Sequence, residues 1–489
     1  MSDIRNLEPK LVWKYFHEIT QIPRPSKKEK GMTEYMKKFG KEHGLETITD
    51  KTGNVILRKP ATKGMENRKG IIMQGHLDMV PQKNSDKKFD FEKDPIETRV
   101  DQGWVKANGT TLGADNGIGV AAAMTAMTDP KVVHGPLEAL FTVDEETGMT
   151  GAKNLKKGIL RGEIMINMDS EDEGELYVGC AGGIDVSATR NYKQEKTPAG
   201  VTAYNITLKG LRGGHSGVDI HLGRANANKL MFRFFQQAEH NFGMRIADFS
   251  GGDLRNAIPR ESFATVVVPS IKKAQFEKFV KGYEKIYRSE FKEVDPDIKM
   301  IAKASEAPAK VMNAGDQYRI IRCVYVCPNG VQRMSHSMPG LVETSNNLAI
   351  VSIREGKFQA HCLTRSSVDT AKEAIAWKIA AGFQLADAEV ELSGSYPGWN
   401  PDMSSPILKT MQETYQKLYG KVPEIKAIHA GLECGIIMGG YPKLDSISFG
   451  PTIRFPHSPD EKVEIESVGK FWNFLVATLK NAPIKKVDL

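Results

Sequence analysis

The chain has 489 residues, so we expect two or three domains rather than one simple core. Its formal net charge of +7 comes from 67 basic and 60 acidic residues with scattered lysines, which argues against a nucleic-acid partner. No apolar run is long enough to span a membrane, and the first residues lack the apolar core of a signal peptide. Five widely spaced cysteines argue against a disulfide framework. We therefore expect a soluble protein in a reducing, cytoplasmic compartment.

Helices and strands alternate in the first part of the chain, up to about Gly183. Helical patterns cover residues 7–40 with a break at 22–26, where Ser26 and Glu29 match a capping box that opens the second helix. Strands are predicted at 54–58, 70–75 and 137–143, and a helix at 117–127. This alternation predicts a mostly parallel sheet covered by helices.

The middle of the chain has a different pattern, which begins after a polar break at 193–200. Strands are predicted at 202–209, 263–268, 298–302 and 388–393, and helices at 224–242, 274–291, 316–326 and 368–385. A hairpin at 348–364 turns at Glu355 and Gly356. We interpret this region as two α+β units in series. After a turn-rich break at 395–399 the α/β pattern returns, with a helix at 405–419, a strand at 444–449 and a closing helix at 470–479.

Residues that can bind a divalent metal follow the strand-like segments of the two α/β parts. His76 ends the run 70–75, Glu146 follows the run 137–143, Asp169 follows 163–168, and His457 follows 444–450. Asp115 stands just before a predicted helix. Because open α/β sheets bind ligands outside the carboxyl ends of their strands, these side chains should meet in one dinuclear site. Two imidazoles with several carboxylates suit zinc better than calcium or magnesium.

Each of these residues taken alone has an ordinary interpretation. Asp115 could cap the helix that follows it, Glu146 could lie in a solvated acidic turn, and His457 could be a surface histidine. Their ordered occurrence favours the metal site. Asp78 lies on the same side of the strand end as His76 and could accept its second N–H. His457 must meet His76, so we expect residues 1–187 and 395–489 to form one domain, with residues 188–394 inserted.

The motifs together resemble the M20 metallopeptidases over nearly the whole chain. The matching strings are His76–Asp78, Gly113–Gly117, Asp144–Gly148, Asp169 and Gly450–Pro459. Gly213–Gly217 matches the histidine loop of the family's lid, and Gly251–Pro259 and His429–Gly435 resemble the aminoacyl-histidine dipeptidase branch. The resemblance implies an α/β fold with a zinc-peptidase-like mixed sheet, helices on both of its faces, and an inserted α+β lid domain.

Residue roles follow from this resemblance. It implies two zinc ions per chain, for which cobalt or manganese can substitute, with Asp115 bridging them. The implied ligands are His76, Asp115, Glu146, Asp169 and His457. Asp78 orients His76, and Glu145 is the general base. His215, Asn256 and Arg365 reach from the lid toward the substrate, and the guanidinium of Arg365 suits a C-terminal carboxylate. Glu433 could bind a free amine or could equally cap a helix.

The implied activity is that of a dipeptidase acting on dipeptides with free termini, in particular Xaa-His substrates including β-alanyl-histidine. The alternative activities are those of an N-acyl amino-acid deacylase or an aminopeptidase of the same family. An amidohydrolase barrel usually opens with His-x-His rather than His-x-Asp, and a non-catalytic binding protein would not retain Glu145. Relatives with a short lid dimerise and exchange the lid histidine. A doubled lid predicts that His215 serves the active site of its own chain. This prediction holds whether or not the protein also forms a homodimer.

Overall fold

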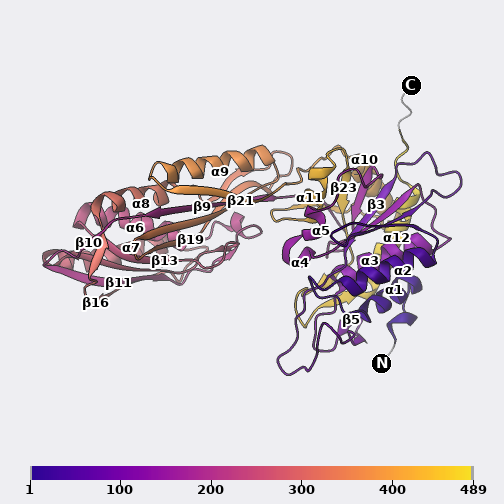
Figure 1. The fold of residues 1–489 in the computed structure, drawn as a ribbon, viewed down its shortest axis with the longest axis horizontal. Coiled ribbons are helices and arrows are strands. Elements are labelled where there is room, and N and C mark those ends of the chain that lie inside the picture. The colour runs from indigo at the N-terminus through magenta and orange to yellow at the C-terminus, as the bar shows by residue number, and fades with distance from the viewer. Residues whose placement is uncertain (1–2, 486–489) are drawn as a thin grey trace. The chain divides into compact units, whose positions relative to one another are not determined.

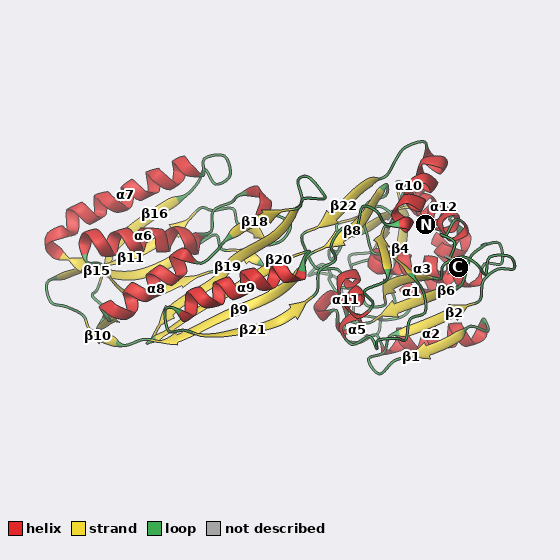
Figure 2. Cartoon of the chain, turned by 90° about the horizontal axis from the view of Figure 1, so that it is seen from above, coloured by secondary structure: helices red, strands yellow, loops and turns green. Residues whose placement is uncertain are grey.

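The computed structural model describes residues 3–485 and divides into two compact units, drawn together in Figures 1 and 2. Unit 1 contains Met1–Gly179, Pro401–Ala427 and Leu432–Leu489, and unit 2 contains Cys180–Asn400 and Ile428–Gly431. The sequence placed the boundaries after residues 187 and 394, whereas the structure places them after 179 and 400. The sequence also left 428–431 in the first domain. In the structure the Ala181 N–H donates to the carbonyls of Ile428 and Ala430, which ties this segment to unit 2.

A mixed eight-stranded sheet forms the centre of unit 1. Its order is β1(Glu46–Thr49), β2(Val55–Lys59), β6(Leu137–Thr142), β3(Ile71–His76), β7(Ile164–Asn167), β23(Asp445–Ser448), β8(Glu175–Cys180) and β22(Glu424–Ile428). The pairs β6–β3, β3–β7 and β7–β23 are parallel, and β1–β2, β2–β6 and β23–β8 are antiparallel. Every residue of β3 and β6 is buried, so the centre of the sheet is covered on both faces.

Eight helices of unit 1 surround this sheet within the described residues. They are α1(Lys10–Thr20), α2(Lys30–Glu42), α3(Ala114–Thr128), α4(Glu145–Gly148), α5(Thr150–Lys153), α10(Pro406–Tyr419), α11(Glu433–Gly440) and α12(Ile465–Lys480). α3 packs against β3 and β6, while α10 and α11 pack against β23. Unit 1 also contains a small antiparallel sheet with the order β24(Ile453–Arg454), β25(Lys462–Glu464), β5(Trp104–Ala107) and β4(Thr98–Asp101). β4 and β5 lie between β3 and α3 in the sequence, and β24 and β25 lie between β23 and α12.

The predicted capping box at Ser26 is wrong. α2 begins at Lys30, its N-cap is Glu29, and no side chain caps it by a hydrogen bond. Ser26 Oγ instead donates to Asp78 Oδ2 at 2.8 Å, and Glu29 Oε1 accepts from the backbone N–H of Lys27 and of Asp144. Both side chains therefore hold the loops at the ends of β3 and β6 rather than the end of their own helix.

Unit 2 is built on one nine-stranded antiparallel sheet. Its order is β16(Lys299–Ser305), β11(Val201–Lys209), β15(Ser262–Pro269), β13(Arg245–Gly251), β19(Val342–Arg354), β20(Lys357–Ser366), β9(Gly182–Asn191) and β21(Glu389–Tyr396), with β18(Gly330–Met334) paired to β19. The predicted hairpin is β19–β20, and Glu355 and Gly356 form its turn with positive φ angles of 49° and 81°. Two-stranded pairs join β12(Gly214–His215) to β14(Ala257–Ile258) and β10(Gln194–Lys196) to β17(Lys310–Met312).

This sheet consists of two βαββαβ halves that are nested rather than in series, which corrects the predicted arrangement. One half runs β11, α6(Ala227–Phe242), β13, β15, α7(Lys273–Glu290), β16. The other runs β9, α8(Ala314–Val326), β19, β20, α9(Asp369–Gln384), β21, and the first half is inserted after its opening strand. In both halves the strands lie in the order fourth, first, third, second. The two second strands, β13 and β19, pair with each other and join the halves.

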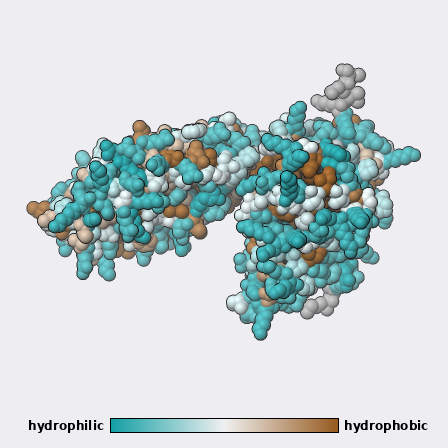
Figure 3. All heavy atoms as spheres, in the orientation of Figure 1, coloured by the Kyte–Doolittle hydropathy of each residue, from teal (hydrophilic) through white to brown (hydrophobic). Residues whose placement is uncertain are grey.

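Helices α6–α9 cover one face of the unit 2 sheet (Figures 1 and 2). The strand side chains on that face, such as Tyr204, Ile206 and Leu208, are buried with Phe232 and Phe276 in one hydrophobic core. Cys323, Cys327 and Cys362 are buried in this core. No helix within residues 3–485 combines the length and apolarity of a membrane span. Hydrophilic residues predominate on the face drawn in Figure 3.

Candidate dinuclear metal site

The predicted metal ligands gather at the carboxyl ends of the parallel strands of unit 1. His76 is the last residue of β3, Glu146 lies just after β6, and Asp169 lies just after β7. His457 lies between β24 and β25, and Asp115 is in the first turn of α3. Asp144, which precedes Glu145, has a φ angle of 53°, and His457 has a φ angle of 58°. Few non-glycine residues adopt such positive values. Such conformations concentrate at functional sites.

Asp115 joins two clusters of potential ligands. Its Oδ1 lies 3.0 Å from His76 Nε2, and its Oδ2 lies 3.2 Å from His457 Nε2. His76 Nε2 also lies 3.2 Å from Asp169 Oδ1, and His457 Nε2 lies 2.9 Å from Glu146 Oε2. The groups His76–Asp115–Asp169 and Asp115–Glu146–His457 can each hold a metal ion. A carboxylate shared between the two groups is the arrangement that a bridging ligand requires.

Asp78 ties the end of β3 to the acidic loop after β6. Its Oδ1 lies 3.4 Å from His76 Nδ1 and accepts from the Glu145 N–H at 3.0 Å, while its Oδ2 accepts from the Glu146 N–H at 3.2 Å. Burial opposes ionisation of Asp78, but hydrogen bonds from His76, the Glu145 backbone and Ser26 lower its pKa to about 2. Asp78 therefore stays ionised and fixes His76, Glu145 and Glu146 relative to one another.

The buried carboxylates of this site favour the binding of cations. Buried carboxylate oxygens without a hydrogen-bond partner occur on Glu146, Asp169 and Glu433. A buried carboxylate oxygen that lacks a hydrogen bond is costly, and a bound metal ion would relieve that cost. Imidazole nitrogen and carboxylate oxygen are donors that zinc, cobalt and manganese accept. The residues present therefore fit a pair of such ions.

Protons occupy the site in the absence of metal. Burial alone would lower the pKa of His76, but the carboxylates of Asp169, Asp115 and Asp78 raise it well above its usual value. Hydrogen bonds to Asp115 and Glu146 raise the pKa of His457 to about 11. Both imidazoles therefore carry a proton that a metal ion would have to displace.

Glu145 has the properties of a general acid–base group. It lies with His76 and Glu146 in a third cluster, but the contacts to His457 and Asp115 are made by Glu146 and not by Glu145. Burial raises the pKa of Glu145 well above its usual value; His76 opposes this shift, and Asp169 and Glu433 add to it. A carboxyl with a raised pKa can take up and return a proton near neutral pH.

Glu433 begins α11 and is 2% exposed. Its Oε2 accepts from Gln74 Nε2 at 2.6 Å and from Thr142 Oγ1 at 2.7 Å, while its Oε1 has no hydrogen-bond partner. Burial raises the pKa of Glu433 to about 7. Gln74 is in turn held by Asn167, whose Nδ2 donates to Gln74 Oε1 at 2.5 Å. Glu433 is thus fixed by buried polar side chains at the ends of β3, β6 and β7, and no side-chain hydrogen bond caps the start of its own helix.

Sequence reasoning missed several residues that hold the site. Arg24 and Glu461 are buried and bind the backbone of the loops that carry Asp78 and Asp115. Ser26, which the sequence predicts as a helix cap, also belongs to this group through its hydrogen bond to Asp78. The available signals were weak: Arg24 is a cation between two prolines, and Glu461 follows His457 by four residues.

The remaining predicted residues belong to unit 2. His215 ends β12, and its Nδ1 accepts hydrogen bonds from the Gly217 and Val218 backbone N–H groups at 3.1 and 3.2 Å. Burial and the charge of Arg365 lower the pKa of His215. The ring is therefore neutral at pH 7, with its proton on Nε2, and it can donate a hydrogen bond from that atom.

Arg365 lies on β20 and is 5% exposed. Its Nη1 donates to the Tyr396 hydroxyl at 3.2 Å, and its Nε has no partner. His429, whose pKa burial and Arg365 lower to about 3, contacts Ser345 Oγ through Nε2 at 2.7 Å. A buried guanidinium with unused donors and no paired carboxylate is suited to an anion.

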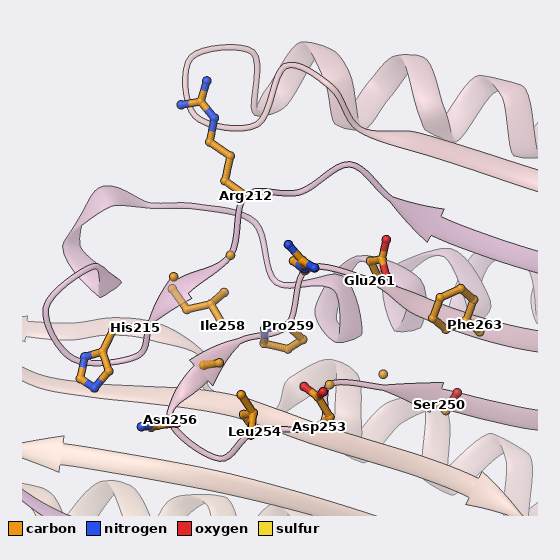
Figure 4. Close-up of a pocket in the computed structure, with 16 residues that line it drawn as sticks. Arg212, His215, Ser250, Asp253, Leu254, Asn256, Ile258, Pro259, Glu261 and Phe263 are labelled. Carbon is orange, nitrogen blue, oxygen red and sulfur yellow. The ribbon is translucent and has the colours of Figure 1, made fainter. Parts of the chain in front are cut away.

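A pocket of about 640 Å³ in unit 2 has His215 and Asn256 among its lining residues (Figure 4). The Ser216 N–H donates to the Asn256 carbonyl at 2.8 Å, and His215 pairs with Ala257 across β12 and β14. The structure thus brings His215 and Asn256 together on adjacent loops of one half of unit 2, while Arg365 comes from the other half.

A buried carboxyl with a raised pKa beside two imidazole–carboxylate clusters is an arrangement typical of metal-dependent hydrolases. Residues 72–481 match the model of peptidase family M20/M25/M40, and the chain belongs to this family. It is therefore an enzyme that hydrolyses peptide bonds.

Two proteins combine full-length coverage with 46–47% sequence identity. The chain is 47% identical over 487 residues to the cytosol non-specific dipeptidase of Escherichia coli strain K12, which covers 99% of this chain and 100% of the relative. The crystal structure of an aminoacylhistidine dipeptidase from Vibrio alginolyticus superposes with a TM-score of 0.96 at 46% identity, covering 99% of both chains. The aminopeptidase PepT from Bacillus cereus ATCC 10987, at 18% identity and a TM-score of 0.57 over 97% of this chain and 99% of PepT, shares the fold.

Proposed function

We propose that this chain is a dinuclear zinc dipeptidase that cleaves dipeptides with both termini free, including Xaa-His substrates such as β-alanyl-histidine. The observation that carries the proposal is the position of Asp115, whose two oxygens contact His76 and His457 separately. The names of the two relatives that match over almost their whole length support a dipeptide substrate, and one of them supports aminoacyl-histidine.

The proposed catalytic steps give a role to Glu145, Asp78 and His215. Two divalent cations held by His76, Asp115, Asp169, Glu146 and His457 would lower the pKa of a water molecule and polarise the scissile carbonyl. Glu145 accepts a proton from the attacking water and returns it to the leaving amine. Asp78 holds Glu145 in place through its backbone N–H. His215 donates a hydrogen bond from its Nε2–H to the oxyanion that develops on the carbonyl, because its Nδ1 is already occupied as an acceptor.

The proposed substrate contacts explain why two free termini matter. Arg365 binds the C-terminal carboxylate with its unused donors, and Asn256 orients the peptide near His215. Glu433 accepts the free amine through its unpartnered Oε1. Each extra residue in the substrate would leave one of these buried charges unpaired, which costs about 2–5 kcal/mol.

Two experiments test the proposal. Removing metal with a chelator should abolish hydrolysis, and zinc, cobalt or manganese should restore it, whereas full activity of metal-free protein would refute the mechanism. A panel of dipeptides, tetrapeptides and N-acyl amino acids tests the substrate. We expect fast cleavage of free dipeptides, with Xaa-His among the best. Fast cleavage of N-acyl amino acids or of tetrapeptides would instead favour a deacylase or an aminopeptidase.

We also propose a cytoplasmic location, supported by the cytosolic name of the Escherichia coli relative. Short peptides are the proposed partners, and neither nucleic acid nor membrane is part of the proposal. Two chains can form a homodimer without changing the chemistry, provided that His215 serves the site of its own chain.

A further inference from the structure

Glu461 is a buried carboxylate that grips the backbone of the loop before α3. It is 2% exposed and lies on the segment between His457 and β25. Its Oε2 accepts from the Leu112 and Gly113 N–H groups at 2.7 and 2.9 Å. Its Oε1 accepts from the Ala114 and Asp115 N–H groups at 2.7 and 3.3 Å. Four consecutive backbone donors therefore converge on one side chain.

Arg24 holds the other side of the same loop. It is 2% exposed, its Nη1 donates to the Leu77 and Asp78 carbonyls at 3.0 and 2.8 Å, and its Nη2 donates to the Gly113 carbonyl at 2.5 Å. The guanidinium thus connects the residues after His76 to the loop that carries Asp115. Gly113, with a φ of 70°, lets this approach happen, because a Cβ there would lie 2.5 Å from Arg24 Nη2.

These contacts hold the backbone from which the Asp115 side chain extends toward His76 and His457. A buried carboxylate is tolerated when hydrogen bonds replace its hydration, and charged acceptors make the strongest such bonds. Any other conformation of the loop would withdraw some of the four N–H groups and leave Glu461 unsatisfied. The energetically favoured loop is the one that holds Asp115 between His76 and His457.

We propose that Glu461 is a positioning residue that preorganises Asp115 to bridge two metal ions, with Arg24 as its partner. The inference rests on the proposed dinuclear site. It predicts that loss of the Glu461 carboxylate weakens metal binding, while the affinity for substrate in the metal-loaded enzyme stays the same. Groups that orient metal ligands typically contribute 10- to 100-fold to metal affinity.

The test is Glu461→Gln, which keeps the shape but turns one acceptor oxygen into an amide that faces backbone donors. Zinc affinity is measured by competition with a chromogenic chelator. We expect the affinity for at least one of two zinc ions to fall by about 10- to 100-fold, with KM for a dipeptide unchanged at saturating zinc. The matched control is Asp460→Asn, which removes the same charge from the exposed neighbouring residue and should bind zinc as wild type does.

The zinc-binding measurements distinguish failure of the proposed function from failure of the positioning role. If wild-type protein does not bind two zinc ions, the proposed function fails. If wild type binds them and folded Glu461→Gln binds them equally tightly, the positioning role is overturned, even when thermal unfolding shows a lower Tm. Hydrogen exchange on metal-free wild-type protein gives a measurement that needs no variant. Slow exchange of the amides of residues 112–115 supports preorganisation, and exchange at the rate of an open loop overturns it.

Discussion

Glu145 and Glu146 are neighbours, yet their surroundings differ. Glu146 Oε2 lies 2.9 Å from His457 Nε2, within one of the two clusters that share Asp115. Glu145 stands beside His76 and has a pKa raised first of all by burial. Adjacent residues in a helical turn point about 100° apart, so one can bind metal while the other faces the substrate.

Replacing each of the two acids should therefore give different defects. We expect Glu145→Ala to keep both metal ions and to lose turnover by about 10²- to 10⁴-fold, as for a general base. Glu146→Ala should lose metal, because it removes a ligand. Metal content and kcat of the two variants, measured side by side, check the prediction. Equal metal loss in both would contradict the assigned roles.

Metal binding should release protons. The pKa of His457 is raised to about 11 and that of His76 lies well above its usual value, so both are protonated at pH 7 without metal. Because metal ligands bind in the deprotonated form, we expect about two protons to leave when zinc binds, and zinc affinity to rise with pH. Titration of zinc into weakly buffered protein with a pH indicator measures this. His457→Gln is the comparison and should release about one proton fewer.

Residues of the site differed in how far the sequence could predict them. His76, Glu146 and Asp169 were predictable because each follows a buried strand, and parallel strands bring such ends together. Glu461 and Arg24 were not, because their partners are backbone groups of segments far away in the chain. Backbone donors carry no side-chain pattern, so a sequence gives no sign of which loop a buried charge will hold.

At the scale of elements, the β13–β19 pairing that joins the two halves of unit 2, here called the joint, depends on a glycine. β13 ends at Gly251, and its last residues pair with Ser352 and Val351 of β19. The next residue, Gly252, has a φ of 75°, and a Cβ there would lie 1.9 Å from the Ala349 carbonyl oxygen. Only glycine permits the chain to leave the joint so close to its neighbour.

Gly252→Ala should therefore destabilise unit 2 more than an alanine at an open left-handed position. Gly223 is the matched control, with a φ of 65° and no atom near its would-be Cβ. We expect Gly223→Ala to cost about 1–2 kcal/mol from the backbone conformation alone. Gly252→Ala should add about 1–3 kcal/mol of collision energy. Urea unfolding of both variants measures the difference, and equal losses would show that the joint tolerates the methyl group.

Most element positions in unit 2 were predictable, but the strands β9 and β13 were not predicted, and neither was the arrangement of the halves. The pattern of apolar residues located strands such as 202–209 and the hairpin at 348–364. The nesting of one half inside the other depends on which strand edges pair, and alternation within a strand does not specify its neighbours. Two βαββαβ halves without a short repeat in their sequence therefore appeared as units in series.

At the scale of the whole chain, the doubling of unit 2 bears on where His215 acts. Both halves have the same strand order, and they meet through their second strands, β13 and β19. The edge that one half would offer to a second chain is thus occupied by the other half of the same chain. His215 and Asn256 come from one half and Arg365 from the other, so a single chain supplies all three. We therefore expect His215 to serve the active site of its own chain.

Mixing two inactive variants tests this prediction. One chain carries Glu145→Ala, the other His215→Ala, and they are co-expressed with different tags and purified as mixed oligomers. If His215 serves its own chain, every site in a mixed oligomer lacks one group and activity stays at the level of the separate variants. If the histidine crosses to a partner, one site of a mixed dimer receives both substitutions. The other site then combines an intact Glu145 with an intact His215. Recovery of a substantial fraction of the wild-type kcat would therefore contradict a lid acting within its own chain.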